Sequence, residues 1–211
     1  MKQQRLIILT LLISSVCLAS YAQGRRVAPE IVKTTFGVKA GLNLASISNG
    51  ETDINFSPGM KAGVMIGAVA NLHFGSRDEG SPVGTGWFGL QPELTYSRQG
   101  FAVDGAAVNF DYIALPVMAK LYVTKELNIE AGPRFAYLLG TSPETTVIQG
   151  AQIAISDLNG GFDVGIAIGA EYETQLGLTI GARYTYGFSN MADNLMWKNS
   201  VISISAGWMF R

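Results

Sequence analysis

Cysteine, histidine and charged residues are scarce in this chain of 211 residues. The chain has one cysteine, Cys17, so it has neither an internal disulfide nor a zinc site built from several cysteines. Its only histidine is His73. Charged residues make up 15% of the chain, against about 25% in ordinary soluble domains. The net charge of −1 lacks the basic excess of a general nucleic-acid-binding protein. We therefore expect no enzymatic activity, no cofactor, no metal and no nucleic-acid partner.

Long apolar runs are also missing after the N-terminal segment, where no stretch approaches 18 consecutive apolar residues. A membrane-spanning helix is therefore not expected there. The hydrophobic content of 48% is nevertheless far too high for a disordered chain. Glycine, with 25 residues, is abundant.

The first 22 residues have the features of a secretory signal peptide. Lys2 and Arg5 precede an apolar stretch over 6–18, and Ser20-Tyr21-Ala22 has small residues at the two positions that a signal peptidase recognises. We predict cleavage between Ala22 and Gln23. The apolar stretch is too short for an uncleaved membrane helix, which needs about 20 residues.

The remaining chain alternates apolar and polar residues with the period of a β-strand. Eight segments of this kind are predicted, at 36–44, 59–72, 88–97, 112–121, 127–137, 163–172, 176–186 and 202–210. Pro92, Pro116 and Pro133 fall inside three of them, and we place these prolines at bulges or strand ends because proline lacks a ladder donor. An even number of strands of this length fits a closed antiparallel barrel.

The predicted connections differ in length between the two ends of such a barrel. Those at 46–58, 98–110, 140–161 and 188–199 are long and polar, whereas those at 124–126 and 173–175 are tight. Outer-membrane barrels have long extracellular loops and short periplasmic turns. The long connection at 73–86 departs from this pattern. We divide the chain into a signal peptide (1–22), a periplasmic lead-in (23–34) and a barrel domain (35–211).

The distribution of charge between the two faces distinguishes a membrane barrel from a soluble, lipocalin-like one. A soluble barrel has its apolar face inside, whereas a membrane barrel has it against lipid and its polar face in the lumen. The apolar face of all eight segments has no charge, and the polar face is rich in glycine, which leaves room for long side chains in a narrow lumen. Aromatic residues expected in the interfacial girdles are Phe36, Tyr96, Phe110, Tyr137, Tyr172, Tyr186 and Trp208. We therefore predict an all-β fold, an eight-stranded antiparallel up-and-down transmembrane barrel in the outer membrane.

Several short motifs carry a resemblance to a known family. They are Phe36-Gly37-Val38-Lys39-Ala40-Gly41-Leu42-Asn43, Gln91-Pro92-Glu93-Leu94-Thr95-Tyr96, Tyr112-Ile113-Ala114-Leu115-Pro116, Gly169-Ala170-Glu171-Tyr172 and Ala182-Arg183-Tyr184. In this order they resemble the Bacteroidetes-type outer-membrane β-barrel family, also described as porin-family or PorT-like proteins. The resemblance implies an outer-membrane barrel with no assigned biochemical activity.

The polar face supplies the candidate functional site, a set of nine lumen charges. They are Lys39, Lys61, Glu93, Lys120, Glu130, Arg134, Asp163, Glu171 and Arg183. Mixed signs favour a plug of salt bridges, because an eight-stranded barrel is just wide enough for its own side chains; a narrow pore or gate is the alternative. Glu130 and Arg134 lie on one segment, so each is expected to pair with a neighbouring strand, and Lys120 is the candidate for Glu130.

Other residues have weaker signals. His73 is predicted to be a surface residue in a turn, and Gly84-Thr85-Gly86 and Gly160-Gly161 are interpreted as loop glycines. Asp53, Asp104 and Asp193 are interpreted as solvated loop charges rather than a calcium site. Trp208 and Phe210 end the last strand with the aromatic pattern that the barrel assembly machinery recognises in the resembling families.

The sequence therefore predicts an exported outer-membrane protein with a structural or surface-interaction role through its outer loops. Its expected partners are membrane lipid, the barrel assembly machinery and an extracellular ligand or protein. A small channel is the second hypothesis, and a soluble ligand-binding barrel is the third.

Overall fold

The computed structural model describes residues 31–48, 59–74, 88–103, 106–142, 145–148, 151–154, 161–189 and 198–210. All of them belong to the second of two compact units, Ile31–Arg211. The strands are β1 (Ile31–Ser48), β2 (Gly59–Phe74), β3 (Phe88–Val103), β4 (Ala106–Tyr122), β5 (Leu127–Ser142), β6 (Thr145–Ile148), β7 (Ala151–Ala154), β8 (Phe162–Glu173), β9 (Leu178–Gly187) and β10 (Lys198–Phe210). Within these ranges no helix is long and apolar enough to cross a membrane.

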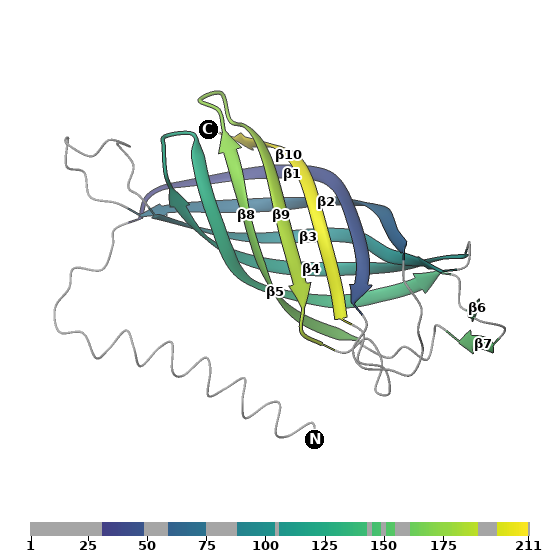
Figure 1. The fold of residues 1–211 in the computed structure, drawn as a ribbon. Helices are drawn as coiled ribbons and strands as arrows, with labels where there is room; N and C mark the ends of the chain where they lie inside the picture. Colours follow the sequence, from purple (N-terminus) through teal and green to yellow (C-terminus); the bar gives the residue numbers. More distant parts are fainter. Residues whose placement is uncertain are drawn as a thin grey trace, which may run out of the picture. The chain divides into compact units, whose positions relative to one another are not determined.

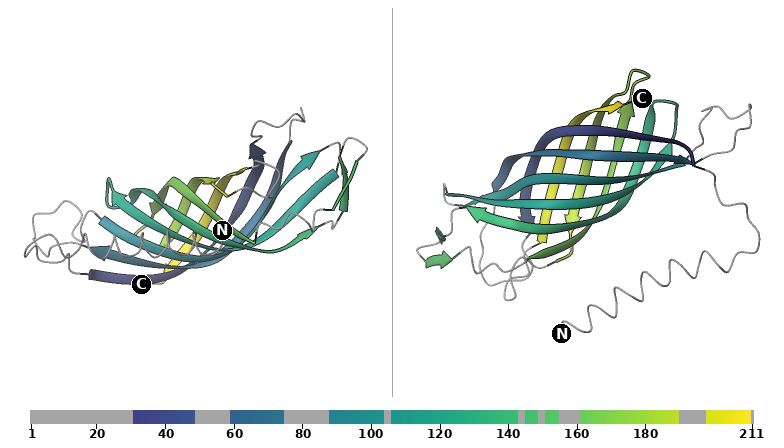
Figure 2. Two further views of the ribbon diagram at one scale, coloured as in Figure 1. Left: turned by 90° about the horizontal axis from the view of Figure 1, so that it is seen from below. Right: turned by 180° about the vertical axis from the view of Figure 1, so that it is seen from behind.

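Eight of the strands form one closed antiparallel barrel in the order β1-β10-β9-β8-β5-β4-β3-β2 (Figure 1). The first and last strands close it, with a continuous register from Phe36 opposite Phe210 to Ser48 opposite Lys198. Figure 2 shows from two further sides that the strands run obliquely around the barrel. The eight-stranded up-and-down barrel predicted from the alternation is confirmed, and each predicted segment lies within or overlaps one strand.

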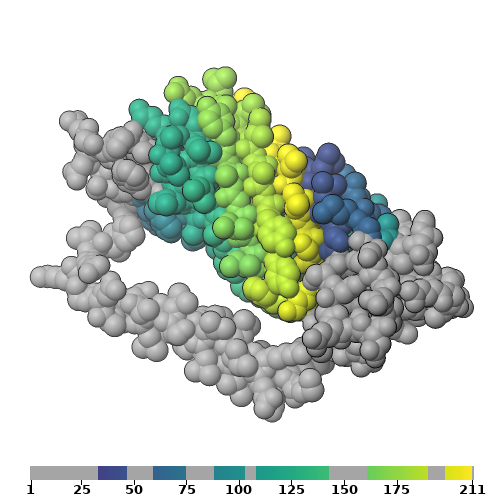
Figure 3. Space-filling model, in the orientation of Figure 1, coloured from purple at the N-terminus to yellow at the C-terminus, as the bar shows by residue number. Residues whose placement is uncertain are grey.

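The two faces of the barrel have the polarity of a membrane protein. Outward residues such as Leu42 and Ile66 are 63% and 61% exposed, whereas the inward Lys39 and Lys120 are 4% and 0% exposed. On the face drawn in Figure 3, the side chains of β5, β8, β9, β10 and β1 form a continuous wall. This polarity is the reverse of a soluble barrel, so the lipocalin-like hypothesis is wrong.

Outward charges are confined to one end of the described strands. At the outward positions of the eight barrel strands, the charged residues are Arg98, Asp111 and Lys198. Arg98 Nε donates to Asp111 Oδ1 at 2.8 Å, and Tyr96 donates from its hydroxyl to the same oxygen at 2.7 Å. The outward apolar side chains form a belt around the barrel, which we call the apolar band. The charged groups mark the level at which β3 and β4 leave this band.

The tight turns lie at the opposite end of the barrel, which we call the turn end. Residues 123–126 join β4 to β5, and residues 174–177 join β8 to β9, so both predicted tight turns are present, each within two residues of its predicted bounds. Gly177 has a φ of 96°, and Met209 donates its backbone N–H to the Gly177 carbonyl at 2.7 Å. The C-terminal strand therefore ends against this turn, and in outer-membrane barrels such short turns face the periplasm. The other end of the barrel is called the outer end.

Several strand boundaries differ from the predicted ones. The connection predicted at 98–110 is wrong, because β3 continues to Val103 and β4 begins at Ala106. The predicted connection at 140–161 contains β6 and β7, which form a separate two-stranded sheet. β1 begins at Ile31, inside the segment interpreted as a lead-in. The signal peptide lies outside the described residues.

The prolines do not occupy the predicted bulges or strand ends. Pro92 lies opposite Val117 with an unchanged register on either side, and Pro116 and Pro133 are likewise paired inside their strands. The register shifts lie elsewhere, between Met60 and Met65 and between Asp111 and Tyr112, for example. A proline removes only one ladder donor, and the two neighbouring strands of a closed barrel retain the rest of the ladder.

Candidate functional site

The candidate site is the charged lumen, and alternation places its residues there. Lys39, Glu93, Lys120, Glu130, Glu171 and Arg183 each occupy an inward position on a different strand, β1, β3, β4, β5, β8 and β9 respectively. Side chains in a strand point to opposite faces in turn. Each of these charged residues has an apolar residue on either side that faces outward, so the charged side chain faces the lumen. Five of these residues are buried, and the Arg183 side chain is 11% exposed.

Ion pairs join these six residues into one connected network. Lys39 Nζ lies 3.1 Å from Glu93 Oε1 and 3.2 Å from Glu171 Oε2. Lys120 Nζ donates to the other oxygen of Glu171. The two carboxylates thus each contact Lys39, and Glu171 bridges both lysines.

The Arg183 guanidinium extends the network to the remaining acid. It donates to both oxygens of Glu93, from Nη1 at 2.9 Å and from Nη2 at 2.8 Å. It also donates to Glu130 Oε1 from Nε at 2.9 Å and from Nη2 at 2.7 Å. Charge-assisted contacts of this kind are the strong class of hydrogen bond.

The network carries three positive and three negative charges, so it is neutral. A seventh and an eighth lumen charge form a second neutral pair, in which Arg134 Nη1 lies 2.8 Å from Asp163 Oδ2. Neutral pairing is the condition under which buried charges are tolerated. Eight of the nine charges predicted for the lumen are therefore brought together in pairs.

Two predictions about the lumen charges are wrong, namely that Lys120 pairs with Glu130 and that Lys61 belongs to the ion-pair network. Lys120 and Glu130 lie directly opposite each other on β4 and β5, but their ion-pair partners are Glu171 and Arg183. Long side chains in a narrow lumen extend across it, so a partner need not lie on the next strand. Lys61 is half-buried and hydrogen-bonds Asn109, and the ion pairs among the described residues do not include it. Arg134 does pair with the adjacent strand β8, as predicted.

Lumen glycines provide the space for the network, as predicted. A Cβ added at Gly207 would lie 2.7 Å from the Val38 carbonyl oxygen and 3.1 Å from Lys39 Cβ, and one at Gly169 would lie 2.5 Å from the Ala182 carbonyl oxygen and 3.2 Å from Arg183 Cβ. The backbone oxygens of the neighbouring strands are therefore closer than the two cations. A larger residue at either position would push the neighbouring strand away and also crowd the cation.

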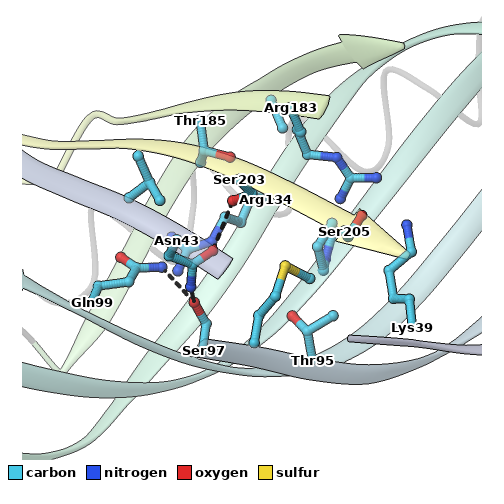
Figure 4. A pocket seen from close by; sticks show the side chains of 14 residues that line it. Lys39, Asn43, Thr95, Ser97, Gln99, Arg134, Arg183, Thr185, Ser203 and Ser205 are labelled. Carbon is cyan, nitrogen blue, oxygen red and sulfur yellow. Dashed lines mark hydrogen bonds between the residues drawn. The ribbon is translucent and has the colours of Figure 1, made fainter. Parts of the chain in front are cut away.

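Amides and hydroxyls fill the next layer toward the outer end. Asn43 and Ser97 lie four residues beyond Lys39 and Glu93 on their strands. Asn43 Nδ2 donates to Ser97 Oγ at 2.9 Å, and Gln99 Nε2 donates to the same oxygen at 2.8 Å. Ser203 donates from its hydroxyl to Asn43 Oδ1 at 2.8 Å. A cavity of about 30 Å³ lies between this layer and the charges (Figure 4).

Buried apolar side chains lie still farther toward the outer end, and the sequence did not predict them. Phe101, Val108 and Phe110 are at most 1% exposed, and the Phe101 and Phe110 ring centroids are 6.0 Å apart. Phe110 therefore faces the lumen, and its predicted place in the interfacial girdle is wrong. Alternation continues through Val108, Phe110 and Tyr112, which is the signal that could have revealed this inward face.

His73 is also misplaced by the sequence interpretation. It lies inside β2, is 9% exposed and stacks on Tyr122 with ring centroids 4.8 Å apart. The Tyr122 hydroxyl lies 3.2 Å from His73 Nε2 and accepts a hydrogen bond from Asn71 Nδ2 at 2.8 Å. His73 thus belongs to a buried polar cluster near the turn end, because β2 continues to Phe74 rather than turning at residue 73.

Comparison with known proteins places this architecture in a family. The sequence profile described as "Outer membrane protein beta-barrel domain" matches residues 21–193, which is most of the chain. The chain belongs to this family. It is an outer-membrane β-barrel protein, with its apolar outward face in the lipid. No curated protein matches the sequence.

Solved structures of other outer-membrane barrels resemble this barrel at low sequence identity. Neisserial surface protein A (NspA) has 13% identity and a TM-score of 0.52, over 84% of this chain and 99% of that chain. Ail of Yersinia pestis has 14% identity and a TM-score of 0.46, over 85% and 100%. OprG from Pseudomonas aeruginosa has 10% identity and a TM-score of 0.40, over 84% and 96%. The likeness to NspA bears on the fold alone.

The remaining candidate residues of this outer-membrane barrel are placed as follows. Trp208 and Phe210 face outward on β10, 46% and 57% exposed, and their role as an insertion signal stays a prediction. The aspartates at 53, 104 and 193 and the glycine motif at 84–86 lie outside the described residues. Among the residues that are described, no group of three or more His, Cys, Asp or Glu side chains could hold a metal ion.

Proposed function

We propose that this protein is a closed, non-conducting barrel that anchors its outer connections in the membrane for contact with an extracellular ligand or protein. The observation that carries the proposal is the neutral ion-pair network across the lumen. Lys39, Glu93 and Arg183 from three separate strands meet in it, and buried inward phenylalanines lie beyond it toward the outer end. Together these two layers support a sealed lumen.

The structured elements beyond the apolar band support a role at the cell surface. β3 and β4 remain paired from Arg98 opposite Asp111 to Val103 opposite Ala106, and β6 and β7 form a sheet of their own. A segment whose backbone is already paired loses less conformational entropy on binding a partner than a free loop does. We also propose export by the predicted signal peptide, recognition of the last strand by the assembly machinery, and membership of the PorT-like branch of the family.

A conductance measurement tests the sealed lumen. The wild-type protein is folded in lipid, checked by its heat-dependent electrophoretic mobility, and inserted into planar bilayers. We expect no steady conductance. The charges along the lumen favour a small channel as the second candidate function, and a steady, charge-selective conductance of the unmutated protein would establish that function instead.

Surface labelling tests the display of the outer connections. In a Cys17→Ser background, Ser142→Cys at the outer end of β5 and Lys125→Cys in a tight turn are treated with a membrane-impermeant maleimide on intact cells. We expect labelling of the Ser142→Cys variant alone, and labelling of both after lysis. Labelling of only Lys125→Cys on intact cells would reverse the orientation and refute the surface role.

A further inference from the structure

At the outer end of the barrel, β5 is paired on one side only. Its pairing with β8 ends at Leu138, which donates its backbone N–H to the Gly161 carbonyl at 3.0 Å. Its pairing with β4 continues to Ser142, which lies opposite Asn109. The strands β6 and β7 pair only with each other. Among the described strands, residues 139–142 therefore form a sheet edge, which we call the β5 edge.

A β-bulge separates β5 from β8 at the start of this edge. Leu138 lies opposite Tyr112 and Gly140 lies opposite Asp111, so Leu139 is an extra residue on β5. A bulge bends its strand, and beyond this one the pairing of β5 with β4 continues without another shift. The β5 edge begins at the level of Asp111, where β4 leaves the apolar band. It therefore lies outside the hydrocarbon layer.

The backbone of Thr141 faces the open side of this edge. In an antiparallel ladder, successive residues bond alternately to the two neighbouring strands. β4 keeps one register with β3 along its length, and Val123, directly after β4, donates its N–H to the Leu127 carbonyl at 2.9 Å. Asp111 lies an even number of residues before Val123, so its backbone groups also face β5, where Gly140 lies opposite. The N–H and carbonyl of the next residue, Thr141, therefore point away from β4.

The side chains of the β5 edge leave it accessible. Leu139 is 57% exposed, and a Cβ added at Gly140 would have no described atom within 4 Å. Natural edge strands are often protected by lysine or proline, and residues 139–142 include neither. The open face of Gly140 leaves room for a large side chain of an added strand, the arrangement by which an aromatic residue covers a glycine on a neighbouring strand.

We propose that the β5 edge binds an extended peptide segment of an extracellular protein, which joins the sheet as a strand beside β5. The proposal rests on the surface role proposed above and names the kind of partner. A backbone N–H and carbonyl on one extended residue are matched by the backbone of another extended chain. In this mode of recognition, main-chain hydrogen bonds supply affinity and alternate side chains supply specificity. Acyl chains of lipid cannot make these bonds, so lipid is a poor occupant.

Hydrogen exchange tests whether the β5 edge is open. Amide exchange is measured residue by residue by NMR on the wild-type protein folded in lipid nanodiscs, without a peptide. We expect slow exchange of the Gly140 amide, which is bonded to β4, and fast exchange of the Thr141 amide. A Thr141 amide that is protected under these conditions would mean that the same chain or a second copy covers the edge, and it would overturn the proposal.

A short fluorescent peptide of alternating threonine and valine with a central tyrosine is the binding probe. The control peptide has the same sequence with a methyl group on every second backbone nitrogen, on the edge that would face β5. We expect saturable binding of the first peptide to the wild-type protein by fluorescence anisotropy, and protection of the Thr141 amide when it is bound. The methylated peptide should bind about tenfold more weakly, the effect of losing one or two backbone hydrogen bonds. Absence of saturable binding, or equal affinity for both peptides, would overturn the proposal.

Two substitutions at Thr141 distinguish its backbone from its side chain. Thr141→Pro removes the N–H that faces the open side, and an edge strand tolerates proline at such a position. We expect this variant to bind the unmethylated peptide about tenfold more weakly than the wild type. Thr141→Val is the matched control, because it keeps the N–H, and it should bind as the wild type does. Equal binding by Thr141→Pro would contradict the proposal, and if that variant does not fold, the methylated peptide still decides.

This proposal and the surface role can fail separately. Peptide binding is measured on the purified protein, so it does not depend on orientation in the cell, whereas labelling on intact cells reports on orientation alone. Labelling as expected without peptide binding would refute the binding edge and leave the surface role in place. Peptide binding with reversed labelling would refute the surface role and, with it, an extracellular partner.

Discussion

A lysine at mid-membrane on the outward face tests the assignment of the two faces most directly. On β8 the outward positions run from Phe162 to Tyr172, and Ile166, 49% exposed, lies near their centre. Ten residues at about 3.3 Å each give about 33 Å along the strand. With a tilt of about 40° this corresponds to about 25 Å across the membrane, the usual height of the apolar band. Ile166 therefore lies close to the bilayer midplane.

We expect Ile166→Lys to destabilise the barrel by about 2–4 kcal/mol, the measured range for a lysine at the midplane. This corresponds to a decrease of about 30- to 1,000-fold in the folding equilibrium constant. The assay is reversible urea unfolding in phospholipid vesicles, followed by tryptophan fluorescence and by electrophoretic mobility.

Ser200→Lys is the matched control, because Ser200 lies outward on β10 two residues from Lys198 at the outer end. A lysine near the interface costs about 0–1 kcal/mol, so this variant should unfold almost as the wild type does. Equal losses of stability for Ile166→Lys and Ser200→Lys would refute the assignment of the outward face to lipid.

Three further substitutions probe the lumen and the turn end. Arg183→Met leaves two buried carboxylates without their main partner and should lower the free energy of unfolding by about 3–5 kcal/mol; a loss below about 1 kcal/mol in urea unfolding would show that the network rearranges. Tyr122→Phe removes a buried hydroxyl with two partners and should cost about 1–3 kcal/mol, whereas Tyr137→Phe on the exposed face should leave the urea midpoint unchanged. Gly177→Ala should cost about 1–3 kcal/mol, because its φ is positive and a Cβ would lie 2.4 Å from the Met209 carbonyl oxygen; an unchanged urea midpoint would contradict this.

Sequence periodicity predicted the membrane barrel for a physical reason that needs no tertiary information. A strand in a membrane barrel has one face in lipid and the other in a narrow lumen, so every second residue is apolar and the residues between are polar or small. Leu42 and Asn43 illustrate this, since the first is 63% exposed to the outside and the second is 1% exposed inside. The inward position of eight paired charges followed from the same alternation.

Strand ends were predicted less well, because the pairing of a hairpin can continue after the lipid-facing pattern stops. Beyond Ser97 and before Tyr112 the outward residues include Arg98 and Asp111, so the apolar alternation ends there. β3 and β4 nevertheless remain paired as far as Val103 and Ala106. His73 was assigned to a turn for a similar reason, since the apolar alternation ended at Leu72.

Within the eight predicted segments the sequence by itself determined which residues face lipid and which face the lumen, because that depends only on the parity of their positions along each strand. Phe110 lies outside these segments, and its inward orientation was found only in the structure. Only the tertiary structure decided which lumen charges pair. Lys120 faces Glu130 across one strand boundary, yet Lys120 pairs with Glu171 and Glu130 with Arg183. Strand stagger and barrel closure set the depth at which each side chain crosses the lumen, and these depend on contacts between strands far apart in the chain.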